Sequence, residues 1–277
     1  MAPTTSSSTG PGFAPVAGNW REYLIEAAGL GAFMISASGF CILLEHPSSP
    51  VRAMIGDPFA RRALMGVAMG LTAVALIYSR WGRLSGAHFN PAVTITFYRL
   101  GKVARRDLAG YVAAQFAGGA AGMAISSALL GRWLAHPAVD YVTTRPGPAG
   151  PLAAFAAESA IAFVLMGVVL LASNSRRYAR LTGVCAGACV ALFIMIEAPI
   201  SGMSLNPART LSSALAARDA SAIWVYFTAP LLGMLAAARA FTFARGPSGV
   251  FCAKLDHAPR VRCIFCEHQA AMRGGAA

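Results

Sequence analysis

Six long apolar segments, separated by polar and charged stretches, dominate the hydrophobic pattern of the chain. They cover Tyr23–Leu44, Ala63–Tyr78, Leu108–Leu130, Leu152–Ala172, Leu181–Ile196 and Ala222–Ala238. A membrane-spanning helix needs about 17 to 25 mostly apolar residues, so four segments are long enough and two fall just short. Most are rich in Gly, Ala and Ser, which let membrane helices approach closely. The pattern therefore predicts an all-α membrane protein with six transmembrane helices surrounded by lipid.

Two further short apolar stretches each follow an Asn-Pro-Ala motif. The motifs are Asn90, Pro91 and Ala92 in the first half of the chain and Asn206, Pro207 and Ala208 in the second. Asn is a favoured helix N-cap, and Pro suits the first helical position because it has no hydrogen bond to lose there. The stretches Ala92–Tyr98 and Ala208–Ala216 are far too short to span a membrane. We expect two re-entrant half-helices whose N-termini meet at mid-membrane.

The two halves of the chain repeat one another. Glu26 and Glu158 each lie near the start of the first span of their half, and each half later carries a Ser-Gly loop before its Asn-Pro-Ala motif. Three spans per half is an odd number, so the halves, about residues 20–131 and 151–243, must insert with opposite orientation. Such an inverted repeat places a functional site near the bilayer midplane.

The composition agrees with a membrane protein, since 56% of residues are hydrophobic and only 12% are charged. In a soluble protein, a net charge of +12 would suggest that the protein binds nucleic acid. Here the basic residues flank the spans. Those after the second, fourth and sixth spans are Arg99, Lys102, Arg105, Arg106, Arg176, Arg177, Arg180, Lys254, Arg260, Arg262 and Arg273. Cytoplasmic loops carry excess Lys and Arg, so both termini are expected in the cytoplasm, although Arg61 and Arg62 lie on the other side. We expect an integral multi-pass protein of a bacterial inner (plasma) membrane with no nucleic-acid partner.

The two ends of the chain differ from the membrane region. Residues 1–19 are rich in Ser, Pro, Gly and Thr and lack the basic start and apolar core of a signal peptide, so they predict a disordered tail. Residues 20–243 form the predicted channel domain. Residues 244–277 form a cytoplasmic tail.

The paired loops resemble those of the aquaporin and aquaglyceroporin family. The likeness runs from about Trp20 to Ala240, and includes the segment Gly110–Gly119 and the position of Pro199. The resemblance implies an hourglass pore in each subunit, a homotetramer, and passive flow of water without a catalytic step or a required cofactor. No zinc-protease pattern or phosphate-binding loop points to an enzyme.

By this resemblance, four positions form the constriction that selects the solute: Met69, Ile194, Met203 and Arg209. Met69 is the least secure assignment, because the spacing from its span to the first motif is one residue longer than in typical members. Water-selective members tend to have an aromatic residue and a His here, so this constriction is expected to be more apolar. Thr210 stands where glycerol-conducting members have Asp.

Water is therefore the first choice of permeant. The alternatives are a facilitator of another neutral solute, namely ammonia, hydrogen peroxide, urea, a metalloid acid or glycerol, and a non-conducting regulatory member of the fold. The resemblance further implies that Glu26 and Glu158 hold the loops in shape. The alternative interpretation of two carboxylates within a membrane is a proton relay. It makes His88 a loop residue that contributes its backbone carbonyl to the pore.

The C-terminal tail carries a separate candidate metal site. Cys252, His257, Cys263 and Cys266 supply the ligand types of a tetrahedral structural zinc site, and His268 can replace one of them. The alternative is a group of reduced thiols without a metal. Cys41, Cys185 and Cys189 lie within spans and are expected to be packing residues.

Overall fold

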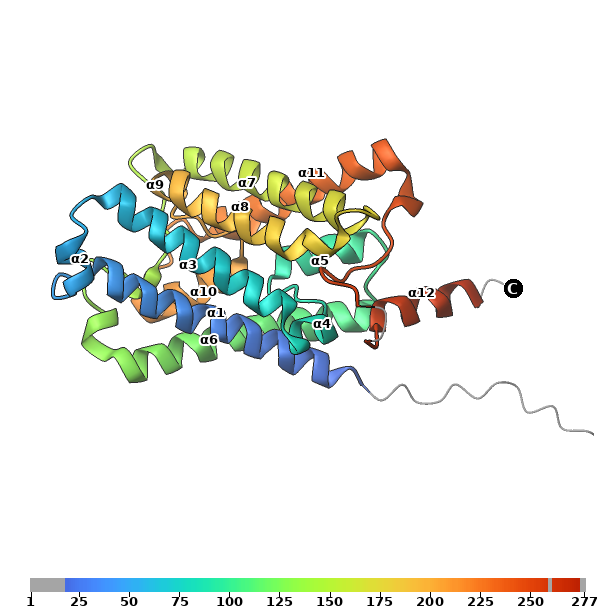
Figure 1. The fold of residues 1–277 in the computed structure, drawn as a ribbon, viewed down its shortest axis with the longest axis horizontal. Helices are drawn as coiled ribbons and strands as arrows, with labels where there is room; N and C mark the ends of the chain where they lie inside the picture. The colour runs from blue at the N-terminus through green and yellow to red at the C-terminus, as the bar shows by residue number, and fades with distance from the viewer. Residues whose placement is uncertain (1–17, 259–260, 275–277) are drawn as a thin grey trace, which may run out of the picture.

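Six long helices form the body of the molecule. The structure is a computed structural model that describes residues 18–258 and 261–274 (Figure 1). The long helices are α1 (Trp20–Glu45), α3 (Pro58–Tyr78), α6 (Arg105–Leu134), α7 (Gly150–Ser173), α8 (Thr182–Ile196) and α11 (Ile223–Arg245). All are apolar enough to cross a membrane when the single turn η2 (Ala179–Leu181) is counted with α8. The prediction of six transmembrane helices in an all-α fold is confirmed, and no strand occurs within the described ranges.

The two segments that looked too short have different explanations. Helix α3 begins at Pro58, because Arg61 and Arg62 belong to its first turns. The guanidinium of Arg61 forms a 3.2 Å ion pair with Glu45, and Arg62 donates a 2.9 Å hydrogen bond to the Met195 carbonyl oxygen. These contacts satisfy two charges that hydropathy alone assigns to a loop. Helix α8 has only 15 residues, and the single turn η2 directly precedes it and lengthens the span.

Two half-helices fill the centre of the bundle. Helix α5 (Pro91–Arg99) and helix α10 (Pro207–Ala217) begin directly after Asn90 and Asn206. Each packs on the last long helix of the opposite half, α5 on α11 and α10 on α6. This crosswise packing is the inverted repeat expressed in three dimensions.

The remaining helical segments are short. They are α2 (Pro50–Met54), α4 (Arg80–Ser85), η1 (Asp140–Val142), α9 (Ala198–Ser201), η3 (Pro247–Gly249) and α12 (Ile264–Gly274).

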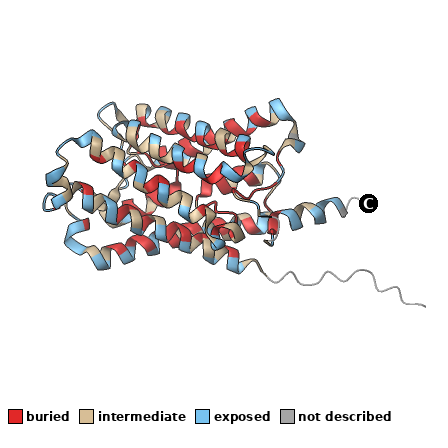
Figure 2. Ribbon diagram, viewed as in Figure 1, coloured by how far each residue is buried: buried red, intermediate tan, exposed pale blue. Residues whose placement is uncertain are grey.

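Small residues set the distances between the long helices. The most extensive contacts join α1 with α6, α7 with α11, and α3 with α8. In the pair α3 and α8, a Cβ atom added at Gly70 would lie 2.5 Å from the Gly187 carbonyl oxygen. In the pair α7 and α11, one added at Gly233 would lie 2.2 Å from the Ser159 carbonyl oxygen. Backbone-to-backbone packing of this kind holds membrane helices together without a hydrophobic driving force, and the buried residues accordingly line the inner faces of the bundle (Figure 2).

Both described ends of the chain leave the bundle at the same end, on the right of Figure 1. After α11 the chain turns back through an irregular segment and ends in α12, which lies beyond α4 and α5. Most of the N-terminal tail that was predicted to be disordered, residues 1–17, lies outside the described residues.

Candidate functional site

The N-termini of the two half-helices are joined through their asparagines. Nδ2 of Asn90 donates a 2.7 Å hydrogen bond to the Leu205 carbonyl oxygen, and Nδ2 of Asn206 donates one of 2.8 Å to the Phe89 carbonyl oxygen. Each side-chain oxygen meanwhile caps its own helix, Asn90 by accepting from the Ala92 N–H at 2.9 Å. A primary amide has two N–H donors. The second N–H of each asparagine is therefore available to a molecule in the cavity that both residues line.

The loop before each half-helix has the same unusual backbone. Both begin with a glycine of positive φ, Gly86 at 103° and Gly202 at 81°. Positive φ values recur at alternate positions, in the first loop at Ala87 and Phe89, and in the second at the corresponding Met203 and Leu205. Such residues are strained and persist only where surrounding contacts hold them.

A buried glutamate supplies those contacts in each half. In the first half the Glu26 carboxylate accepts hydrogen bonds from the backbone N–H of His88 at 3.1 Å and of Phe89 at 2.5 Å, and from the Ser85 hydroxyl. Both carboxylate oxygens are thus engaged with the strained loop.

The second half repeats this arrangement. The Glu158 carboxylate accepts from the backbone N–H of Ser204 at 2.6 Å and of Leu205 at 2.8 Å, and from the Ser201 hydroxyl. The hydroxyls of Tyr111 and Tyr226 donate 2.5 Å hydrogen bonds to the carbonyl oxygens of these same serines, Ser85 and Ser201 respectively. The two loops are therefore held by one symmetric set of contacts.

One continuous cavity of about 500 Å³ runs past both loops. Met69, Ile194, Met203 and Arg209, the four residues expected at the constriction, all line it. Met69, the least secure of the four assignments, is fully buried on α3 and lines this cavity with the other three.

Arg209 brings an unpaired donor to the cavity. It follows the second motif on α10 and is 8% exposed, and its Nη1 atom has no hydrogen-bond partner among the described residues. A buried donor left without a partner is costly, and Arg209 as a whole lines the cavity, so its guanidinium is the candidate donor to an acceptor that enters there.

His88 has a larger part in the structure than its sequence position indicates. Its Nε2 lies 2.8 Å from the Ala253 carbonyl oxygen, in the C-terminal tail, and its Nδ1 lies 3.0 Å from the Thr94 hydroxyl. The imidazole stacks between Phe97 and Phe265, with ring centroids 5.2 Å and 5.4 Å away. His88 thus connects the first loop to the tail, a contact that no spacing rule in the sequence reveals.

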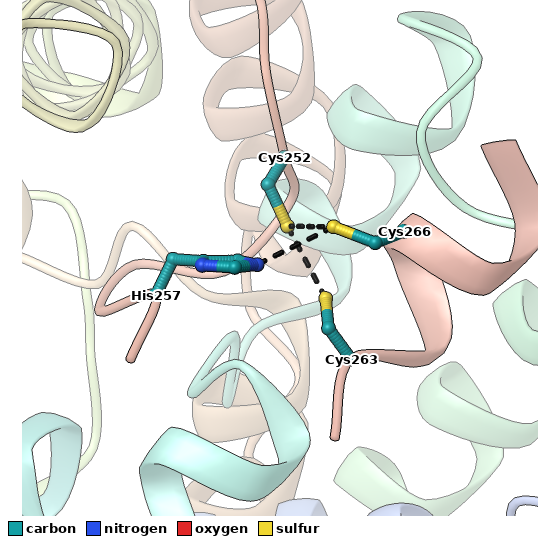
Figure 3. Close-up of side chains that lie close together, drawn as sticks. All are labelled: Cys252, His257, Cys263 and Cys266. Atoms are coloured by element: carbon teal, nitrogen blue, oxygen red, sulfur yellow. Dashed lines mark hydrogen bonds between the residues drawn. The ribbon is translucent and has the colours of Figure 1, made fainter. Parts of the chain in front are cut away.

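The four predicted metal ligands of the tail converge. The sulfur atoms of Cys252, Cys263 and Cys266 and the imidazole of His257 lie within 4.8 Å of one another (Figure 3). His268 is not part of this group.

Two further tail residues, Leu255 and Lys254, have structural contacts that were missed by sequence reasoning. Leu255 is among the lining residues, and its backbone N–H donates to the Gly86 carbonyl oxygen at 3.1 Å. Lys254 is 2% exposed, and its burial lowers the pKa of the ammonium group below its ordinary value. The nearest available sequence signal was the Cys/His cluster, whose side chains converge in the same part of the tail.

Comparison with known proteins agrees with this geometry. The family model described as "Major intrinsic protein" matches residues 15–241. Aquaporin NIP6-1 of Arabidopsis thaliana is 38% identical over 194 residues, which are 70% of this chain and 60% of that protein. Aquaporin NIP2-3 of Zea mays is 34% identical over 231 residues, 82% of this chain and 74% of that protein. The chain spans about 60% of the length of the first of these relatives.

A solved structure has the same fold. The X-ray structure of the aquaglyceroporin from Plasmodium falciparum superposes with a TM-score of 0.66 at 21% identity, covering 83% of this chain and 98% of the other. The family-model match covers most of the chain, and the relatives agree with it. The chain therefore belongs to the major intrinsic protein family of membrane channels.

Proposed function

We propose that the chain is a passive transmembrane channel that conducts water in single file. The observation that carries the proposal is the meeting of two Asn amides, from half-helices of opposite orientation, in one continuous cavity. Irregular backbone at membrane depth is tolerated where it lines a water-filled space. The naming of relatives as aquaporins is consistent with water as the permeant.

The proposed pathway offers a solute both donors and acceptors at its midpoint. The free N–H groups of Asn90 and Asn206 donate, and the carbonyl oxygens of the strained loops accept. Each helix N-terminus carries about +0.5 elementary charge, and two of them face the same region. That field opposes the passage of cations, including protons, while a neutral molecule passes.

Arg209, with Met69, Ile194 and Met203, forms the proposed selectivity constriction. The guanidinium of Arg209 donates to the solute, and its charge adds to the exclusion of cations. In this proposal Glu26 and Glu158 are scaffold residues, because their oxygens are already engaged by the loops they hold.

A second candidate function is the facilitation of another small neutral solute, such as ammonia, hydrogen peroxide, urea, a metalloid acid or glycerol. The observation that favours it is the side-chain chemistry of the constriction, where three of four residues are apolar and two are flexible methionines. An apolar lining of this kind replaces fewer of the hydrogen bonds that water loses on entry than a polar lining would.

Further parts of the proposal concern organisation. Residues 20–243 form the channel and residues 244–277 a tail, both termini lie in the cytoplasm, and four subunits assemble in lipid. The excess of basic residues at the end of the bundle from which the chain ends emerge supports this orientation.

Stopped-flow light scattering on proteoliposomes tests the function. Water permeability well above that of empty liposomes is the expected result, followed by a panel of the neutral solutes named above. If neither water nor any solute moves faster than through empty liposomes, the chain is a non-conducting member of the fold and the proposal is wrong.

A further inference from the structure

The four ligand atoms in the tail already have the spacing of a metal centre. Sγ of Cys252 lies 3.4 Å from Sγ of Cys263 and 3.8 Å from Sγ of Cys266, while Nε2 of His257 lies 3.3 Å from Sγ of Cys266 (Figure 3). Tetrahedral zinc with Zn–S bonds of about 2.3 Å sets its sulfur ligands about 3.8 Å apart. A disulfide requires about 2.05 Å, so these thiols are placed around a common centre rather than bonded in pairs.

The donor set selects the kind of metal. Three thiolates and one imidazole suit a tetrahedral d¹⁰ ion, whereas calcium and magnesium take oxygen ligands. Cys252 and Cys263 are both 8% exposed, which gives the centre a dry side. His257 and Cys266 approach from the solvent side, so an ion has a route of entry.

A buried lysine beside the cluster supplies the matching charge. Nζ of Lys254 donates hydrogen bonds of 2.6 Å to the carbonyl oxygens of Arg83 and Arg262, and it pairs with no carboxylate of the described residues. A buried charge without a counter-charge is expensive. Zinc bound by three thiolates and a neutral imidazole has a net charge of −1, which would balance this ammonium group.

The tail segment that carries the four ligands also contacts the loop before the first half-helix. Besides the contacts of His88 with Ala253 and of Leu255 with Gly86, the Arg83 guanidinium forms a 2.7 Å ion pair with Asp256. Phe265 is fully buried against the loop, where its ring also packs edge-on to Tyr111 at 5.9 Å. Every one of these contacts comes from a residue between or directly beside the four ligands.

Among the described residues of the tail, Leu255 is the one that lines the cavity proposed as the pore. It is three residues after Cys252 and two before His257, and it lines the cavity with only 7% of its surface exposed. An apolar side chain at a pore mouth obstructs water, because it offers no hydrogen bond in exchange for hydration. A metal that ties the flanking ligands together would fix Leu255 in this place.

We propose that Cys252, His257, Cys263 and Cys266 bind one Zn²⁺, and that the ion holds the tail across the pore mouth with Leu255 restricting flow. The described residues between Gly246 and α12 contain little regular secondary structure, and metal binding commonly supplies the folding free energy of such segments. Loss of the metal would release the tail and open the mouth. The restriction rests on the proposed channel function, whereas the metal site does not.

The metal site is tested by elemental analysis of the purified full-length protein. We expect one zinc per chain in the wild type and in His268→Ala, and a loss of most zinc in Cys263→Ser and His257→Ala. Less than half an equivalent in the wild type, or equal loss in His268→Ala and His257→Ala, would overturn the site. Because a ligand variant can fail to fold, wild-type protein is also chelated and reloaded with Co²⁺. Visible absorption of tetrahedral thiolate-bound cobalt supports the site, and octahedral cobalt contradicts it.

The restriction is tested by comparing proteoliposomes made from zinc-loaded, chelated and reloaded protein. We expect a several-fold rise in water permeability on chelation and its reversal on reloading. Equal permeability of the loaded and chelated forms, both above empty liposomes, would overturn the restriction and leave the channel function intact. If no form exceeds empty liposomes, the channel function fails.

A substitution at the pore mouth separates the metal from the obstruction. Leu255→Ala is expected to keep its zinc and to conduct several-fold more water in the zinc-loaded form. Leu232→Ala is the matched control, because Leu232 is 53% exposed on the outer face of α11. Unchanged permeability in Leu255→Ala with full zinc occupancy would show that Leu255 does not restrict flow.

Discussion

Gly118 of α6 lies so close to α1 that a Cβ atom added to it would be 2.1 Å from the Ala27 carbonyl oxygen. The helices cannot keep this distance with any side chain at Gly118. Gly118→Ala should therefore force α1 and α6 apart and lower the thermal stability of the detergent-solubilised protein, although alanine is the better helix former by about 1 kcal/mol.

Gly39→Ala provides the matched control. Gly39 lies on α1 with nothing within 4 Å of the added Cβ atom, so the same change should be neutral or stabilising there. Circular dichroism during heating measures both variants. Equal melting temperatures would show that the close approach of α6 to α1 is not required.

A second prediction concerns Arg209 in the proposed constriction. Arg209→Val removes the positive charge and the Nη1 donor from the cavity, so larger neutral solutes and cations should be excluded less strictly. Permeability to urea and to protons should rise relative to water. Arg99→Val is the control, since Arg99 is an exposed residue at the end of the other half-helix. Unchanged selectivity in Arg209→Val would remove Arg209 from the constriction.

A third prediction tests the charge balance at the proposed midpoint of the pore. Asn206→Asp keeps an oxygen to cap α10 but replaces the donor to the Phe89 carbonyl with a negative charge. The charge would offset the two positive helix ends, so proton permeability should increase. A pH-sensitive dye inside proteoliposomes records the rate, with wild-type and empty liposomes as references. Proton exclusion equal to the wild type would contradict the proposed role of the helix dipoles.

A fourth prediction concerns the buried carboxylate of the second half. Glu158→Gln replaces an acceptor of three hydrogen bonds with an amide that has only one oxygen, so at least one buried donor, such as the Leu205 N–H, is left unpaired at about 1 to 3 kcal/mol. Both thermal stability and water permeability should fall. Asp57→Asn is the control because asparagine caps a helix as well as aspartate does, and Asp57 is the N-cap of α3. A Glu158→Gln protein with wild-type stability would argue against the scaffold role.

A fifth prediction addresses solute choice. The double substitution Met69→Phe with Ile194→His makes the lining bulkier and more polar, so urea permeability should fall more steeply than water permeability. Stopped-flow measurements with both solutes give the ratio. A ratio equal to that of the wild type would place the selecting step elsewhere in the cavity.

The membrane fold could be predicted from the sequence because its signals are local. Long apolar runs identify six spans, and the Asn-Pro pairs identify where α5 and α10 begin. The boundaries were less accurate where polar side chains find partners inside the bundle, as Arg61 does with Glu45. Hydropathy counts such a charge against a helix, although its ion pair satisfies it.

The docking of the tail was beyond sequence reasoning for a different reason. The cluster of Cys252, His257, Cys263 and Cys266 was visible as a spacing of ligand types. Its attachment to the pore loop uses backbone oxygens, such as those of Ala253 and Gly86, which every residue carries. A contact made by the backbone does not require a particular residue type, so it cannot be predicted from the sequence and is seen only in the structure.

The reciprocal hydrogen bonds between the N-termini of the two half-helices also constrain how the protein can be made. The partner of Asn90 is the carbonyl of Leu205, 115 residues later in the chain. At roughly 5 to 20 residues per second, a ribosome needs about 6 to 23 s to synthesise that interval. During this time the first half-helix is already made while the backbone group that pairs with its terminal asparagine does not yet exist. The first loop therefore cannot reach its final hydrogen-bonded structure while the first half is being synthesised. It does so only after the second half has been made.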